Sequence, residues 1–289
     1  MTQVTNPTQP ASSLPGGVGA GGFDVIGIQA DNRLNGGPGS DFFQTFAGTD
    51  VIAGGGGNDL IRTGGGNDSI GGGDGNDTIL SGSGSDVVAG VSGDEFIYGG
   101  KGDDLVDGGD GNDVILGDRG NDTVLGGSGS DTVFGNQGND VVSGGDGNDS
   151  LFGGKDNDSV NGGSGNDFIS GDRGSDVLTG GAGSDTFYFF SSGGEYGVDT
   201  ITDFTPTEDK IKLKTTGGGV FGGLGTALEA SEFVVVSGFN AATPGTTTTN
   251  KLVYDPTNGA LYFNGSSGVL TIAQLQPGLT ITTNNFELF

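Results

Sequence analysis

The nine residues GGDGNDVIL at Gly108–Leu116 decide the fold of this chain. Their pattern, Gly-Gly-x-Gly-x-Asp-x-apolar-x, returns in GGDGNDSLF at Gly144–Phe152 and, with small changes, through the middle of the chain. An acid stands at every ninth residue, and an apolar residue follows each acid two positions later. A flexible glycine-rich linker would show no such register, so the sequence indicates a structural repeat. The 17 acidic positions are Asp41, Asp50, Asp59, Asp68, Asp77, Asp86, Glu95, Asp104, Asp113, Asp122, Asp131, Asp140, Asp149, Asp158, Asp167, Asp176 and Asp185.

Each unit predicts a turn followed by a short strand. The stretch Gly-Gly-x-Gly-x-Asp has turn composition, and glycine lets carbonyl oxygens point inward without a Cβ clash. The residues around Asp113-Val114-Ile115 alternate as in a strand with one buried side chain. Two units would close one coil of 18 residues, so the acids would form two columns on opposite edges, starting at Asp41 and Asp50. Neighbouring acids in a column would lie one strand spacing apart, ~4.8 Å.

Such turns are suited to calcium. A turn rich in inward carbonyls and closed by a carboxylate offers hard oxygen ligands, and Ca²⁺ takes six to eight of these at ~2.3–2.6 Å in a tolerant geometry. Mg²⁺ would demand a stricter octahedron. Columns of nine and eight acids leave gaps for at most 15 interior ions, so we expect multiple Ca²⁺ ions, up to about 15.

Composition excludes several function classes. The chain has no His and no Cys, which removes His-bearing zinc motifs, disulfides and nucleophile pairs that need either residue. A formal charge of −27 argues against nucleic-acid binding. No apolar run reaches the ~20 residues of a membrane span. Most of the acids, 26 of 37, lie in the repeat region Gly36–Tyr188, so we expect no enzymatic activity.

The repeat resembles that of the RTX (repeats-in-toxin) family of calcium-binding proteins, over Gly36–Tyr188. The resemblance implies an all-β, right-handed parallel β-roll, a β-helix or solenoid, with a C-terminal β cap. It also implies that the 17 acidic side chains and turn carbonyls bind Ca²⁺. Carried onto this sequence, the carbonyls are those of residues such as Gly109, Gly111, Gly127 and Gly129.

The segment after the repeat, Asp199-Thr-Ile-Thr-Asp203-Phe204, resembles the one that closes RTX rolls in serralysin-type proteases. That resemblance implies that Asp203, together with Glu195, completes the last calcium site. The alternative is that both are ordinary surface residues of a strand.

We expect three parts: 1–26, loosely ordered or capping; 27–189, the roll; and 190–289, a β cap with a secretion signal. The first 25 residues lack the basic start and apolar centre of a signal peptide. The end, Phe286-Glu287-Leu288-Phe289, resembles the uncleaved signal of type I secretion substrates. An ordinary terminal strand is the alternative, and both can hold together.

Three units depart from the pattern, and we expect weaker calcium sites there. In the unit around Asp50, Thr45 and Phe46 replace the opening glycines. In another unit, Glu95 is one methylene longer than Asp, and Val91 replaces a usual glycine. In the third unit, Asp156 lies two residues before the acid, a position that is glycine in all 16 remaining units. Aspartate tolerates positive φ better than most residues.

The resemblance and the composition together predict a secreted, non-catalytic calcium-binding protein of the cell surface or extracellular matrix. Its expected partners are calcium ions and the type I secretion machinery. One alternative is a self-assembling or adhesive structural subunit, such as a surface layer or filament, because the open ends of a roll expose strand edges. A remote alternative is an accessory module of a secreted enzyme.

Overall fold

The computed structural model describes residues 3–4, 24–27, 29–190, 197–214, 224, 228–229, 232–238, 251–265 and 268–289. They belong to two units, Met1–Leu151 and Phe152–Phe289, which we describe in turn. Most of the expected N-terminal part, 1–26, and the whole of Glu195 lie outside the described residues. No helix in the described part of the chain is both long and apolar enough to cross a membrane.

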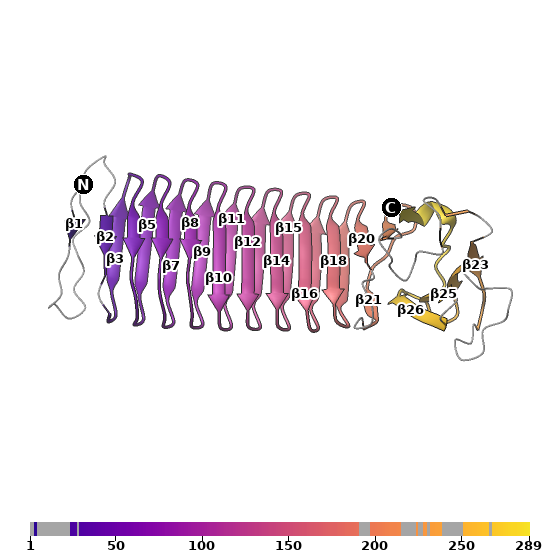
Figure 1. The fold of residues 1–289 in the computed structure, drawn as a ribbon. Helices are drawn as coiled ribbons and strands as arrows, with labels where there is room; N and C mark the ends of the chain where they lie inside the picture. Colours follow the sequence, from indigo (N-terminus) through magenta and orange to yellow (C-terminus); the bar gives the residue numbers. More distant parts are fainter. Residues whose placement is uncertain are drawn as a thin grey trace. The chain divides into compact units, whose positions relative to one another are not determined.

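The first unit is built from parallel strands that alternate between two sheets (Figure 1). In sheet A the order is β1 (Gln3–Val4), β2 (Asp24–Ile26), β4 (Phe42–Gln44), β6 (Leu60–Arg62), β8 (Thr78–Leu80), β10 (Phe96–Lys101), β12 (Val114–Arg119) and β14 (Thr132–Gln137). In sheet B the order is β3 (Arg33–Gly37), β5 (Val51–Gly56), β7 (Ser69–Asp74), β9 (Val87–Ser92), β11 (Leu105–Asp110), β13 (Thr123–Ser128) and β15 (Val141–Asp146).

Paired residues on neighbouring strands are 18 positions apart. Ile97 pairs with Ile115 in sheet A, and Val106 pairs with Val124 in sheet B. This confirms the predicted parallel β-solenoid in which two nine-residue units make one coil.

The core of the first unit is a ladder of single apolar side chains, two per coil. These are the residues two positions after each acid, and none is more than 3% exposed. Burying one such side chain contributes about 1.5–3 kcal/mol. Two positions further along, a buried glycine such as Gly99 or Gly117 adds no side chain to the core. The ladder is Phe43, Ile52, Ile61, Ile70, Ile79, Val88, Ile97, Val106, Ile115, Val124, Val133, Val142 and Leu151.

The second unit continues the repeat and then changes character. Strand β16 (Ser150–Lys155) contains the residues at which the two units meet in the sequence. One sheet runs β18 (Phe168–Arg173), β20 (Thr186–Phe189), β22 (Lys210–Leu213) and β27 (Phe286–Leu288). The other runs β17 (Ser159–Ser164), β19 (Val177–Ala182), β21 (Asp199–Ile201), β26 (Gly268–Gln274), β25 (Ala260–Gly265), β24 (Lys251–Asp255) and β23 (Phe233–Val235). A short 3₁₀ helix, η2 (Thr283–Asn285), precedes β27.

The last strands follow the array without its spacing. β26 lies parallel to β21, and β27 lies parallel to β22, so each of the two sheets continues past the repeat with a further strand. β24, β25 and β26 form an antiparallel meander, and β23 pairs in parallel with β24. The terminal residues are therefore part of a sheet, which is the alternative that the sequence left open.

Candidate metal sites

All 17 repeat acids are buried, and none is more than 3% exposed. They lie in the turns that follow the strands, and their side chains point into the roll, because the glycines around them leave room. Burying a carboxylate is costly unless something compensates for its charge. The hydrogen-bond partners of its two oxygens show how far the cost of burying each carboxylate is offset.

In most repeat acids, one oxygen of the carboxylate joins a ladder of hydrogen bonds along the edge of the roll. Asp113 Oδ1 accepts a hydrogen bond from the amide of Glu95 at 2.8 Å, and Asp131 Oδ1 accepts one from the amide of Asp113 at 2.8 Å. On the other edge, Asp122 Oδ1 accepts from the amide of Asp104 at 2.9 Å. Each of these aspartates is therefore hydrogen-bonded to the backbone of the acid 18 positions before it, and these bonds align the column.

The second oxygen is different. Within the described part of the chain, this buried atom has no hydrogen-bond partner in most repeats. Ten such atoms are the Oδ2 atoms of Asp50, Asp59, Asp68, Asp77, Asp86, Asp104, Asp113, Asp122, Asp131 and Asp176. A buried anionic oxygen without a donor costs free energy, and a cation beside it would remove that cost.

This second oxygen faces a space that only glycine leaves open. A Cβ atom on Gly108 would overlap Asp113 Oδ2 and would lie 2.5 Å from the carbonyl oxygen of Gly126, in the next coil. A carboxylate oxygen and a carbonyl oxygen from successive coils thus converge on one place. The sequence did not single out the Gly126 carbonyl, because its direction depends on how neighbouring coils stack. This donor set, all hard oxygen, fits Ca²⁺.

The four carbonyls predicted from the resemblance point from one turn toward the next. A Cβ atom on Gly127 would overlap the Gly109 oxygen, and one on Gly129 would overlap the Gly111 oxygen. The oxygens of Gly127 and Gly129 face the following coil in the same way. Both Gly127 and Gly129 have positive φ, at 116° and 135°, so L side chains would be strained there. As calcium ligands, the four carbonyls stay a prediction.

Electrostatics along the columns favours a bound cation. Burial, and then neighbouring carboxylates, raise the pKa of Asp122 to about 7 and that of Asp59 and Asp131 to about 6. No three acidic side chains of the described residues gather closely enough to hold a metal by themselves. Any ion in the columns would therefore take much of its coordination from backbone carbonyls.

The two columns end at acids that the repeat spacing does not reveal. Asp199 Oδ1 accepts from the amide of Asp176, and Asp209 Oδ1 accepts from the amide of Asp185, both at 3.0 Å. Both acids are buried, at 7% and 3% exposed. A signal existed in the sequence, since each keeps the Asp-x-Ile pattern, but their spacings of 23 and 24 residues break the period.

Asp203 lies off these columns. Its two carboxylate oxygens accept hydrogen bonds from the amides of Gly180 and Gly181, at 2.9 and 2.8 Å. The carboxylate is thus already engaged with backbone donors. Asp209 Oδ2 is also engaged, by the amide of Thr205 at 2.7 Å. That Asp203 completes a calcium site stays a prediction.

Three residues that depart from the pattern, Glu95, Val91 and Asp156, differ from the others in structure. Neither carboxylate oxygen of the buried Glu95 makes a hydrogen bond within the described residues, and burial together with Asp113 raises its pKa to about 8. Val91 has a φ of 97°, which a β-branched residue rarely adopts. Asp156 has a φ of 77°, which aspartate tolerates better.

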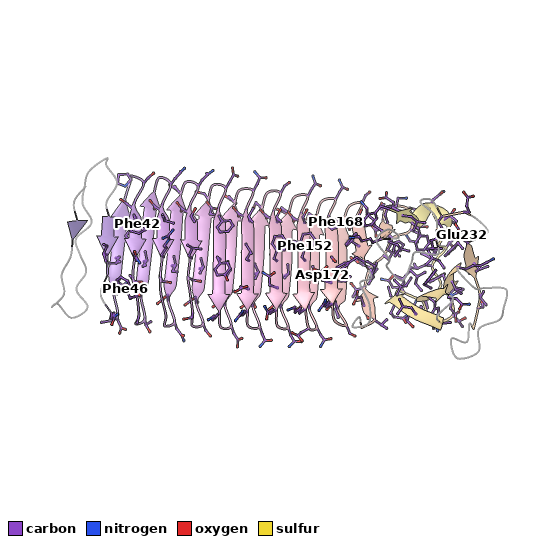
Figure 2. The ribbon with its side chains drawn as sticks, viewed as in Figure 1. Phe42, Phe46, Phe152, Phe168, Asp172 and Glu232 are labelled. Atoms are coloured by element: carbon purple, nitrogen blue, oxygen red, sulfur yellow. The ribbon has the colours of Figure 1, made fainter. Side chains whose placement is uncertain are left out.

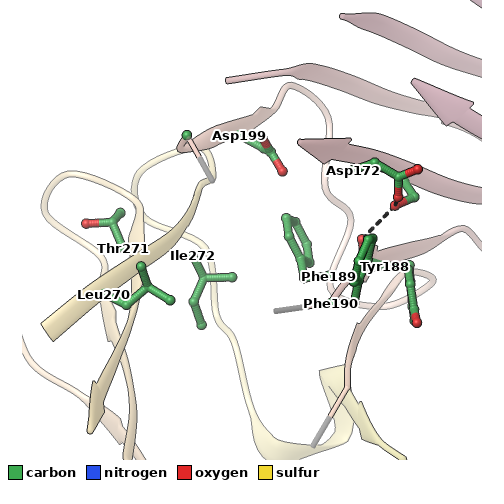
Figure 3. A pocket seen from close by; sticks show the side chains of 10 residues that line it. Asp172, Tyr188, Phe189, Phe190, Asp199, Leu270, Thr271 and Ile272 are labelled. Atoms are coloured by element: carbon green, nitrogen blue, oxygen red, sulfur yellow. Dashed lines mark hydrogen bonds between the residues drawn. The ribbon is translucent and has the colours of Figure 1, made fainter. Parts of the chain in front are cut away.

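A cavity of about 40 Å³ lies in the second unit near acidic groups (Figure 3). Its lining includes Asp172, Asp199 and the apolar side chains of Phe189 and Ile272. Asp172 Oδ1 accepts a hydrogen bond from Ser170 Oγ at 2.6 Å.

Comparisons with known proteins agree with the repeat. Residues 26–61, 54–88, 89–124, 125–160 and 161–189 match the family model described as "RTX calcium-binding nonapeptide repeat (4 copies)". Among solved structures, the chain matches the crystal structure of the extracellular lipase LipA from Serratia marcescens with 16% identity and a TM-score of 0.25. The match covers 94% of this chain and 41% of the lipase chain. No curated protein matches the sequence. With the family model matched over more than half of its length and the repeat acids buried in two columns, this chain belongs to the RTX family of calcium-binding nonapeptide-repeat proteins.

Proposed function

We propose that this protein is a secreted, non-catalytic calcium-binding protein whose folding is driven by Ca²⁺, at the cell surface or in the extracellular matrix. One observation carries the proposal: the second oxygen of the repeat acids is buried, lacks a donor among the described residues and faces a carbonyl of the next coil. An ion placed there supplies the missing partner.

The charge of the array explains why folding would need the ion. Gly36–Tyr188 carries 26 acids and 5 bases, a net charge of −21, on a backbone rich in glycine. Ordering that backbone is costly in conformational entropy, and compaction brings like charges together. Metal binding and folding are then one transition, because the complete set of ligands exists only in the folded chain.

The two columns of acids set an upper bound on the number of Ca²⁺ ions that the roll can bind. Fifteen interior ions would bring a charge of +30 to an array of −21. The last ions would then meet a net positive array, and screening over ~8 Å relieves this only in part. We therefore expect a tightly bound majority and a weaker remainder near Glu95 and Asp156, where the turns depart from the pattern.

Export would occur through a type I machinery that recognises the C-terminal residues. The support is the resemblance of the ending Phe286-Glu287-Leu288-Phe289 to such signals. The absence of His and Cys from the whole sequence supports the non-catalytic part of the proposal.

A pair of substitutions tests the calcium sites. Asp113→Asn keeps the size of the side chain and the oxygen that accepts from the Glu95 amide, but it removes the charge beside the Gly126 carbonyl. Asp110→Asn removes the same charge from an exposed neighbour. We expect the calcium concentration at the midpoint of folding, followed by circular dichroism, to rise severalfold for Asp113→Asn and to stay unchanged for Asp110→Asn. Equal shifts for the two variants would show that the buried column does not bind the ion.

A further inference from the structure

Three units of the array lack the glycine that leaves room beside the acid. This glycine stands five residues before the acid, as Gly108 does before Asp113, and we call it the site glycine. It is present in 14 of the 17 units. The replacements are Thr45 before Asp50, Thr63 before Asp68, and Ser81 before Asp86. They lie in consecutive coils of one column, beginning beside Phe46 (Figure 2).

The site glycine marks the place where the ligands of an ion converge. A Cβ atom on Gly153, in the same column, would lie 2.5 Å from Asp158 Oδ2 and 2.9 Å from the carbonyl oxygen of Gly171 in the next coil. These separations are close to the ~2.3–2.6 Å at which Ca²⁺ binds oxygen. A side chain at this position would therefore put its Cβ atom where the ion belongs.

Thr63 and Ser81 place side chains in this space. Both are buried, as is Thr45. The Thr63 hydroxyl donates a hydrogen bond to the carbonyl oxygen of Ser81, and the Ser81 hydroxyl donates one to that of Gly99. These two carbonyls are the counterparts of the Gly126 carbonyl, which faces the space for an ion in its own coil. Each hydroxyl thus engages an oxygen that would otherwise be available to Ca²⁺.

The backbone of sheet A changes at the same three positions. Strands β4, β6 and β8 each end at the residue directly before Thr45, Thr63 or Ser81. Strand β10 instead continues through the site glycine Gly99, and β12 and β14 continue through theirs. The three coils with a hydroxyl therefore differ from the later coils in backbone as well as in side chain.

The opposite edge of these coils keeps its site glycines, Gly36, Gly54 and Gly72. A Cβ atom on Gly54 would overlap both Asp59 Oδ2 and the carbonyl oxygen of Gly72. The opening for an ion is therefore retained in the column that starts at Asp41. The two edges of one coil differ in this respect.

We infer that Thr45, Thr63 and Ser81 close three gaps of the Asp50 column to Ca²⁺, so that the N-terminal coils bind ions along one edge only. The inference rests on the proposed calcium binding and refines it, because at most 12 of the 15 interior gaps then stay open. The hydroxyls link successive coils through their hydrogen bonds to the next carbonyl. The aspartates still align the column, since the amides of Asp50 and Asp68 donate to the Oδ1 atoms of the next acids, both at 2.8 Å.

The second oxygen of these aspartates then needs a partner other than an ion. A neutral carboxyl can donate from that oxygen to the hydroxyl beside it, and the hydroxyl donates in turn to the carbonyl of the next coil. Such a chain carries no charge, so burying it costs less than burying a carboxylate that has no cation beside it.

Counting the Ca²⁺ bound to the full-length chain tests the inference. The opened variant, Thr45→Gly with Thr63→Gly and Ser81→Gly, restores the site glycine in all three units. The matched control, Thr45→Ala with Thr63→Ala and Ser81→Ala, removes the same hydroxyls but keeps each Cβ atom. Each protein is dialysed against the same saturating concentration of Ca²⁺, and the ions per chain are measured by inductively coupled plasma mass spectrometry.

We expect the opened variant to bind about three more ions than the unaltered chain, because glycine frees the place of the ion. The alanine variant should bind no more ions than the unaltered chain, since its Cβ atoms still fill that place. An opened variant that folds but gains no ions would overturn the inference. An alanine variant that loses ions would also overturn it, because the hydroxyls would then be calcium ligands.

Gly99→Ser provides a test that does not depend on the folding of the opened variant. Gly99 is the next site glycine of the same column, and a Cβ atom on it would lie 2.9 Å from Asp104 Oδ2 and 2.8 Å from the carbonyl oxygen of Gly117. This substitution, made in the unaltered chain, should cost one ion. An unchanged ion count in a folded Gly99→Ser protein would contradict the inference.

Circular dichroism and the total ion count separate this inference from the proposed function. If the unaltered chain binds Ca²⁺ and gains β signal, but the variants bind as many ions as it does, only the closure of the three gaps is wrong. If the unaltered chain binds no Ca²⁺ and gains no β signal, the proposed function itself fails.

Discussion

In most repeat acids the two carboxylate oxygens have different roles. One oxygen accepts a hydrogen bond from the amide of the acid 18 positions earlier, and the other faces the space shared with the next coil. The register of the acids could be predicted from the sequence, and so could their two columns. The split between the two oxygens could not, because it depends on the turn backbone and on the stacking of coils.

Val91 gives a prediction at the scale of a single residue. It has a φ of 97°, and it is half exposed. The equivalent residues of the next two coils are Gly109 and Gly127. A non-glycine residue there costs about 1–3 kcal/mol. We expect Val91→Gly to raise the free energy of unfolding of the calcium-loaded protein by about 1 kcal/mol, measured by urea denaturation at fixed Ca²⁺.

Val87 provides the matched control for this prediction. It is equally exposed, at 50%, and lies in the same strand, but it does not have a positive φ. Val87→Gly should therefore destabilise the protein by about 0.5–1 kcal/mol. The strain account of Val91 would be wrong if both substitutions moved stability in the same direction.

At the scale of elements, the turns are tied to one another by a second ladder. The residue before most of the acids accepts a hydrogen bond from the amide 18 positions later, as Asn58 does from Asn76 at 3.0 Å and Asp94 from Asn112 at 2.9 Å. This ladder runs in the opposite direction to that of the buried acids. Asn, Ser and Asp tolerate turns, but the ladder itself could not be predicted from the sequence, because it depends on the stacking of coils.

The terminal strand β27 gives the prediction for an element. Asn285, just before it, is buried and donates to the Pro206 carbonyl at 2.8 Å, and the Phe286 ring lies 5.2 Å from that of Phe233. Deleting 285–289 would expose β22 as well as remove the proposed export signal. We therefore expect the deletion to weaken calcium-dependent folding of the second unit and to reduce release through a type I exporter.

Phe233→Ala separates these two effects. It removes the ring that packs against Phe286 but leaves residues 285–289 unchanged, so it should weaken folding while the protein is still released. Release and calcium-dependent circular dichroism are measured for both variants. Equal release of the deletion variant and the unaltered chain would refute the signal interpretation.

At the scale of the whole molecule, the sequence predicted the solenoid but not its ends. The period of nine was enough for the parallel pairing and the apolar ladder, because both follow from register alone. The column ends at Asp199 and Asp209 were missed because the chain inserts extra residues before each.

The titration of the buried acids predicts how pH acts on the ion-free chain. Burial raises the pKa of Asp122 to about 7 and that of Asp59 to about 6, whereas an unfolded aspartate titrates near 3.9. The folded form therefore binds protons more tightly, so its stability is greatest below about pH 4 and is lost as the pH rises through about 6–7. In EDTA we expect more β signal at about pH 5 than at about pH 8. A spectrum that does not change over this range would contradict the raised values.

The central claim is that Ca²⁺ drives the folding of the roll, and far-UV circular dichroism of the full-length chain at neutral pH tests it most directly. The spectrum is recorded in EDTA and again in millimolar Ca²⁺, with Mg²⁺ at the same concentration as the control. We predict a largely unfolded spectrum in EDTA and with Mg²⁺, and a β spectrum with Ca²⁺ that EDTA reverses. A chain that keeps its full β signal in EDTA would show that the buried carboxylates fold without the ion, and the account would be wrong.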